Sequence, residues 1–143
     1  MKETDITLLQ FIRQNAQMGT VTLSKLKDML SDGIVKTIIG NQLDEYNEVF
    51  EGAGKMLDEA GEEAKNVNGF MQTMAETMID MQAIADKSSS HIAERVLLGS
   101  TRGVIKILRH LREQKDASIA VSGLAYKLLY IEQTNIEQMK RFL

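Results

Sequence analysis

A carboxylate and an amide lie where the sequence pattern predicts the interior of a helical core. Glu132 and Asn135 fall in the apolar stripe of the last segment of the chain. An isolated buried carboxylate is costly, so Glu132 must be paired, hydrogen-bonded or protonated with a raised pKa. Tyr46 and Gln42 lie in the stripe of an earlier segment and are the expected partners.

Two interpretations of this group are open. In the first, Glu132 and its partners form a buried polar cluster that fixes the register of the helices, as a single core asparagine does in a coiled coil. In the second, Glu132 is a metal ligand or a proton-transfer residue, with Glu94 and Glu45 as helpers from the edges of their apolar arcs. We favour the first interpretation.

Charge is segregated along the chain. Residues 44–63 contain eight acidic residues and one lysine, whereas residues 95–115 contain six basic residues and one acid. Four cations share one helical face over about 21 Å: Arg95, Arg102, Lys106 and Arg109. This face can contact an anion or a nucleic acid, or it can simply face solvent. No aromatic residue interleaves with the cations, so we do not expect nucleic acid as a partner.

A methionine stripe distinguishes the segment from 67 to 85. Its apolar positions are Val67, Phe70, Met71, Met74, Met78, Met81 and Ala85. Methionine adapts to irregular surfaces, and we expect this narrow-faced helix to dock on the rest of the chain. If it does not dock, the stripe is an interface for an oligomer or a partner, and charges at Met74 and Met78 would weaken that oligomer.

Five helical segments must position these side chains. Apolar residues recur in alternating steps of three and four, which is typical of amphipathic helices. The segments cover residues 4–31, 35–60, 67–85, 90–114 and 118 to the end. Thr4 or Asp5 can cap the first helix, and Asp32-Gly33 ends it with glycine in the left-handed conformation. Gly99 and Gly103, one turn apart, predict the close approach of another helix.

The fold class that these segments predict is all-α. A short connection makes the first two helices antiparallel neighbours, each of about 26–28 residues. A connecting helix of about 17–19 residues then carries the chain back along them. We therefore expect a four-helix bundle with ferritin-like up-down pairs and an additional amphipathic connecting helix, in a single domain over residues 1–143. A five-helix up-and-down array is the alternative.

Two stretches near the end of the chain carry a resemblance to a known family. They are His91-Ile-Ala-Glu94-Arg-Val-Leu-Leu-Gly99-Ser-Thr-Arg-Gly103 and the ending from Ile131 to Leu143. They resemble uncharacterised bacterial proteins of the ferritin-like four-helix-bundle type, most strongly over residues 88–143. The resemblance implies the fold and raises the question of a metal.

The usual di-iron ligands of ferritin-like proteins are missing. Such sites take a Glu-x-x-His motif from each of two helices, whereas the only histidines, His91 and His110, do not follow a glutamate by three residues. No Ser–His arrangement and no phosphate-binding glycine loop is present either. We therefore expect no catalytic, cofactor-binding or metal-binding residue.

Composition excludes several further classes of protein. The 143 residues include no cysteine, which excludes disulfides, thiolate-held iron–sulfur clusters and Cys₂His₂ zinc fingers. They include no proline, which is typical of a nearly all-helical chain. The net charge of −3 excludes a globally basic nucleic-acid binder. No apolar run is long enough for a signal peptide or a membrane helix, which predicts a cytoplasmic protein without a membrane partner.

These observations predict a non-enzymatic cytoplasmic helical-bundle protein. We expect it to form a homo-oligomer or to bind a protein partner. The alternative is a ferritin-like metal-binding protein with a degenerate carboxylate site around Glu132.

Overall fold

The computed structural model describes residues 1–66, 69–84 and 86–143. It contains five helices: α1 (Glu3–Asp28), α2 (Ile34–Glu59), α3 (Phe70–Gln82), α4 (Ser89–Glu113) and α5 (Ile119–Lys140). The described residues contain no strand, so the all-α prediction is confirmed. The predicted stripe positions Val67 and Ala85 lie outside the described residues.

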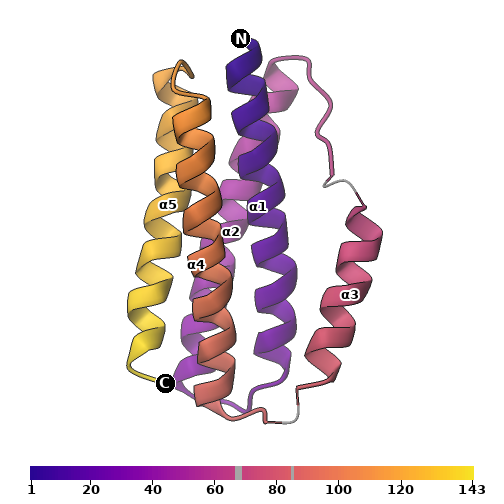
Figure 1. Ribbon diagram of the computed structural model, residues 1–143, viewed down its shortest axis with the longest axis vertical. Coiled ribbons are helices and arrows are strands. Elements are labelled where there is room, and N and C mark those ends of the chain that lie inside the picture. Colours follow the sequence, from indigo (N-terminus) through magenta and orange to yellow (C-terminus); the bar gives the residue numbers. More distant parts are fainter. Residues whose placement is uncertain (67–68, 85) are drawn as a thin grey trace.

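The four long helices lie side by side, and α3 lies at the edge of the molecule (Figure 1). Helix α1 packs against α2, and α4 packs against α5. The two pairs meet where α1 contacts α4 and α5 and where α2 contacts α5. The chain direction in Figure 1 makes α2 and α4 parallel, because α3 carries the chain back down the outside of α1.

The predicted stripes of α1 and α2 form the centre of the core. Their fully buried members are Leu9, Ile12, Ala16, Ile39, Gln42, Val49 and Ala53. Burying a Leu, Ile or Val side chain contributes about 1.5–3 kcal/mol relative to leaving it exposed, so these positions hold the pair together. At the end of α2 the stripe drifts, and Leu57 is buried instead of Met56 or Ala60.

Helix α1 ends earlier than predicted. Its last residue is Asp28, and the backbone N–H groups of Met29 and Leu30 donate to the carbonyls of Leu26 and Lys27. These bonds satisfy the helix end without a left-handed residue. Gly33 is extended, with φ 162°, and is the N-cap of α2. The prediction that Gly33 ends α1 in the left-handed conformation is therefore wrong.

Helix α3 is also shorter than predicted, with 13 residues. It spans about 20 Å and reaches along only half of α1. Met81 is buried against the core, whereas Met74 and Met78 are half-buried. The helix therefore docks on its own chain through its C-terminal end.

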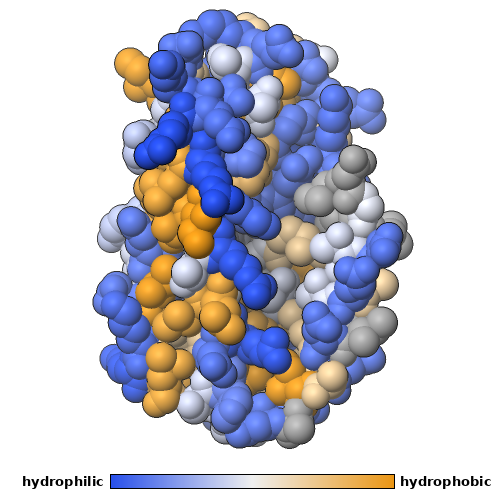
Figure 2. Space-filling model, in the orientation of Figure 1, coloured by the Kyte–Doolittle hydropathy of each residue, from blue (hydrophilic) through white to orange (hydrophobic). Residues whose placement is uncertain are grey.

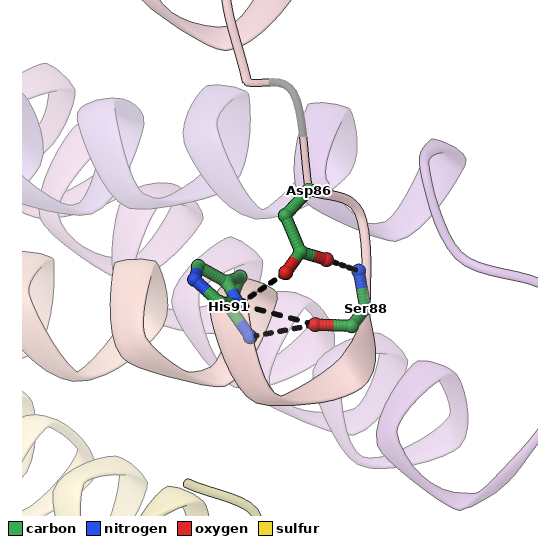
Figure 3. A network of polar contacts seen from close by, with 3 residues as sticks. All are labelled: Asp86, Ser88 and His91. Atoms are coloured by element: carbon green, nitrogen blue, oxygen red, sulfur yellow. Dashed lines mark hydrogen bonds and ion pairs between the residues drawn. The ribbon is translucent and has the colours of Figure 1, made fainter.

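Helix α4 begins in a network of polar contacts that involves His91 (Figure 3). Ser88 is the N-cap, and its hydroxyl accepts the backbone N–H of His91 at 3.3 Å. The Asp86 carboxylate accepts the backbone N–H of Ser88 at 2.8 Å and lies 2.9 Å from Nδ1 of His91. His91 thus belongs to a helix cap at the surface.

The buried carboxylate of Asp5 joins the beginnings of α1 and α5. It accepts the backbone N–H of Ser118, the N-cap of α5, at 2.6 Å, and the backbone N–H of Lys2 at 3.2 Å. The bond from Ser118 is the main reason why the pKa of Asp5 lies below its ordinary value.

Replacing Asp5 with alanine should lower the free energy of unfolding by about 2 kcal/mol, because the partly buried N–H of Ser118 loses a charged acceptor. The folded pKa is depressed, so this contribution is complete above the unfolded pKa of 3.8 and is lost as the pH falls through the folded pKa. Urea unfolding of wild type and variant across the acidic range measures both effects. Asp44→Ala, at an exposed position of α2, is the control. Equal losses in both variants would contradict the role of Asp5.

Candidate functional site

The predicted polar cluster lies among the four long helices. Glu132 on α5 is 2% exposed, and the hydroxyl of Tyr46 on α2 donates to its Oε2 at 2.5 Å. The side-chain amide of Asn15 on α1 donates to Oε1 of Glu132 at 3.3 Å. The amide of Asn135 donates to the Tyr46 hydroxyl oxygen at 3.4 Å. The prediction that Glu132 is buried and paired with Tyr46 is confirmed, and we call these four residues the polar cluster.

Burial dominates the electrostatics of the polar cluster. It raises the pKa of Glu132 to about 7, although hydrogen bonds from Tyr46, Ser100 and Asn15 act in the opposite direction. Burial and the neighbouring Glu132 charge raise the pKa of Tyr46 well above its ordinary value. Glu132 therefore changes its protonation state near neutral pH, while Tyr46 remains a hydrogen-bond donor.

Two glycines leave the space that these side chains occupy. A Cβ atom on Gly103 of α4 would lie 2.6 Å from Cδ of Glu132, and one on Gly19 of α1 would lie 2.9 Å from the Tyr46 ring. The close neighbour of Gly103 is thus the Glu132 side chain and not the backbone of another helix. A Cβ atom on Gly99 would meet nothing within 4 Å, so the predicted close helix approach at Gly99 is wrong.

The predicted partner Gln42 does not bond to Glu132. Its side-chain amide donates to Oε1 of Gln138 at 2.9 Å instead. Within the described residues, Oε1 of Gln42 and Oδ1 of Asn135 are buried without a hydrogen-bond partner. An unpaired buried polar atom costs about 1–3 kcal/mol, which offsets part of what the hydrogen bonds of the polar cluster contribute to stability.

Asn15 was missing from the sequence prediction. It stands one position before Ala16, at the edge of the α1 stripe. The helical period places Asn15 at the margin of the core, but it does not predict that the Asn15 side chain contacts α5. The glycines offered the better signal, because Gly19 and Gly103 interrupt buried stripes where a bulky neighbour needs room.

The donor set around Glu132 does not fit a metal ion. In the part of the chain that the structure describes, no group of three or more His, Cys, Asp and Glu side chains is placed to hold one. Glu94 is exposed, and Glu45 lies near Glu48 and Lys127, so neither predicted helper joins Glu132. A phenol and two amides surround a single carboxylate, whereas divalent iron sites use several carboxylates and imidazoles.

A groove leads from the surface to the polar cluster. It has a volume of about 720 Å³, lies between α1, α3 and α4, and is lined at its inner end by Tyr46, Glu132, Gly19 and Gly103. The four cations predicted to share one face of α4 line the same groove. His110 also lines it and stacks on Phe11 with ring centroids 3.6 Å apart.

Comparison with known proteins gives the fold. No family model matches the chain, and no curated protein matches it. The chain is similar to a solved structure, the crystal structure of a DUF305 fragment from Deinococcus radiodurans, with a TM-score of 0.77. The two share a fold. The match covers 98% of this chain and 95% of that one at 14% sequence identity, a level at which the likeness shows the fold alone.

Two further expectations concern the ferritin-like resemblance and the absence of a membrane helix. The resemblance of residues 88–143 to ferritin-like proteins stays a prediction, because none of the comparisons names such a protein. Across the described residues, no helix combines the length and the apolar character needed to cross a membrane.

Proposed function

We propose that this protein is a non-enzymatic, cytoplasmic four-helix bundle with ferritin-like up-down pairs that self-associates through α4 and α5. The pairing of α1 with α2 and of α4 with α5, linked by the segment containing α3, supports the ferritin-like connectivity. The donor set of the polar cluster, one carboxylate with a phenol and two amides, gives no support to the metal-binding alternative.

The observation that carries the proposal is an apolar surface over α4 and α5. We call it the α4–α5 patch, and its large side chains are 45% to 92% exposed: Leu98, Ile105, Leu108, Ile119, Tyr126 and Tyr130. Figure 2 shows hydrophobic atoms gathered over these two helices. Exposed clusters of large apolar side chains mark interaction sites in monomeric folds, and tyrosine is enriched at interfaces.

The methionine stripe of α3 is a weaker candidate for the interface. Its member Met81 is already buried within the chain, and Met74 and Met78 are half-buried. The α4–α5 patch instead comes from regular helices that pack firmly on each other. A second copy can cover the patch by placing its own α4 and α5 against it, as in a two-fold dimer.

Introducing a charge into the patch should dissociate the oligomer. Ile105→Lys and Tyr130→Lys are each expected to convert a wild-type dimer to a monomer, because a lysine ammonium would have to lose its hydration in the interface. Sedimentation equilibrium over a range of concentrations measures the mass. Ile34→Lys, an equally drastic change at a 60% exposed position of α2, should leave the dimer unchanged.

A wild-type chain that remains monomeric at the highest soluble concentration would rule out self-association. If instead the wild type is a dimer and both patch variants keep its mass, the dimer interface lies outside the α4–α5 patch. Circular dichroism of each variant confirms that a loss of mass does not reflect unfolding.

A further inference from the structure

The groove between α1, α3 and α4 combines an apolar wall with a charged rim. Its apolar lining comes from all three sides: Phe11 and Met18 on α1, Met81 at the end of α3 and Ile84 just beyond it, and on α4 Val96 and Leu98, the last of which also belongs to the α4–α5 patch. Its volume of about 720 Å³ lies within the range of about 300–1,000 Å³ that small-molecule pockets occupy.

The rim of the groove is cationic. Arg95, Arg102, Lys106 and Arg109 line one side of it, and we call them the cationic row. Acidic lining residues are fewer, namely Asp80 on α3 and Glu113 on α4, besides Glu132 at the inner end. Within the described residues, no member of the cationic row forms an ion pair with an acidic side chain. Figure 2 shows strongly hydrophilic side chains running over α4, beside the recess on the α3 side.

Glycines open the α4 side of the groove. Gly99 and Gly103 both line it, and a Cβ atom on Gly99 would project into open space. The absence of side chains there lets the groove continue inward from the cationic row to Tyr46 and Glu132. The result is a groove with an apolar wall, cations along its edge and a polar group at its inner end.

We propose that this groove binds a long-chain fatty acid from solution, with the acyl chain along the apolar wall and the carboxylate on the cationic row. The proposal does not rest on self-association through the α4–α5 patch. A guanidinium pairs with a carboxylate through two parallel hydrogen bonds, which suits Arg95, Arg102 and Arg109. The apolar wall supplies the larger part of the binding energy, because it removes the acyl chain from water.

Other anions suit the groove less well. A nucleic acid would use the cationic row but would leave the apolar wall without a partner, and α4 carries no Phe, Tyr or Trp on which a base could stack. A small inorganic anion would likewise leave the wall empty. An uncharged alcohol would fill the wall and leave the cations unpaired.

Isothermal titration calorimetry with palmitate below its micelle concentration tests the proposal. The wild-type chain should bind one palmitate per chain. Arg102→Gln combined with Lys106→Gln should weaken binding by about tenfold or more, because two charged partners of the carboxylate are lost. Arg112→Gln, on the same helix but outside the groove lining, should bind like wild type.

A second pair of variants tests the location. Gly99→Leu fills the groove from an open position and should abolish binding. Gly123→Leu makes the same change at a position of α5 where a Cβ atom also meets nothing within 4 Å, and it should leave binding intact. Both variants replace a helical glycine, so their effects on helix stability match.

Three comparison ligands distinguish the alternatives. 1-Hexadecanol should bind more weakly than palmitate, and neither inorganic phosphate nor a short single-stranded oligonucleotide should show saturable binding. The proposal is overturned if palmitate does not bind or if Gly99→Leu binds it as wild type does. Binding of the oligonucleotide without binding of palmitate would also overturn it and would assign the cationic row to nucleic acid.

Discussion

Gly103→Ala is expected to destabilise the protein by about 2–3 kcal/mol, although alanine is the better helix former. The new methyl group would lie 2.6 Å from Cδ of Glu132 and would displace the carboxylate from the hydroxyl of Tyr46. The buried carboxylate would then lose its strongest donor while remaining away from water. Because Gly103 sits within a packed stretch of α4, the backbone cannot retreat without disturbing Ile107 and Ser100, which are buried on the same face.

Gly99→Ala, one turn earlier in the same helix, is the matched control. Its methyl group would meet nothing within 4 Å, so the change should stabilise the protein by up to about 1 kcal/mol through helix propensity. Thermal and urea unfolding of both variants measure the difference. Similar effects of the two substitutions would contradict the interpretation that Gly103 makes room for Glu132.

A double variant identifies the cause of the Gly103 effect. In a chain that already carries Glu132→Ala, Gly103→Ala should cost much less, because the group that it strikes is gone. The coupling energy between the two positions should therefore be large and favourable. An unchanged cost in the Glu132→Ala background would place the clash elsewhere.

Wild-type stability is expected to fall as the pH rises from about 5 to about 8, by about 2–3 kcal/mol from Glu132 alone. The folded pKa of Glu132, about 7, lies above the ordinary value of 4.5. The folded state therefore binds the proton more tightly than the unfolded state between these values. The stabilisation is complete below the unfolded pKa and is lost as the pH rises through the folded pKa.

Glu132→Gln removes this pH dependence while keeping an acceptor for Tyr46. Urea unfolding at several pH values between about 5 and about 8 should give a sloping stability profile for wild type and a flatter one for the variant. Glu137→Gln, at an exposed position five residues later in α5, should keep the wild-type slope. Parallel profiles for wild type and Glu132→Gln would show that Glu132 titrates as it does in water.

The spacing of apolar residues in the sequence was sufficient to predict the helices of this protein. Steps of three and four placed Leu9, Ile12 and Ala16 on one face of α1 and Glu132 on the inner face of α5, and these residues are buried. The helix boundaries depend on local backbone hydrogen bonds, which the spacing of apolar residues does not predict. Asp32-Gly33 has turn chemistry, yet α1 already ends at Asp28 because its last N–H groups turn back onto nearby carbonyls.

The polar cluster was predictable in part. The carboxylate at Glu132 and the phenol at Tyr46 stood out because polar groups inside apolar stripes need partners. Gln42 was an equally good candidate by position, but it lies one turn before Tyr46 on α2, and its amide donates to Gln138. Which of two positions one turn apart faces Glu132 depends on how α2 and α5 pack along their length, which no local pattern contains.

The orientation of each helix about its own axis also determines which apolar residues are exposed. The helical period places Ile107 at the centre of the apolar stripe of α4 and Ile105 and Leu108 on its flanks, and Ile107 is fully buried whereas the other two are exposed. Their exposure follows from the place where α1 and α5 contact α4. The local sequence thus establishes which faces are apolar, because side-chain direction repeats with the helical turn. The pairing of those faces, the open patch and the groove arise from packing among helices that are distant in the chain.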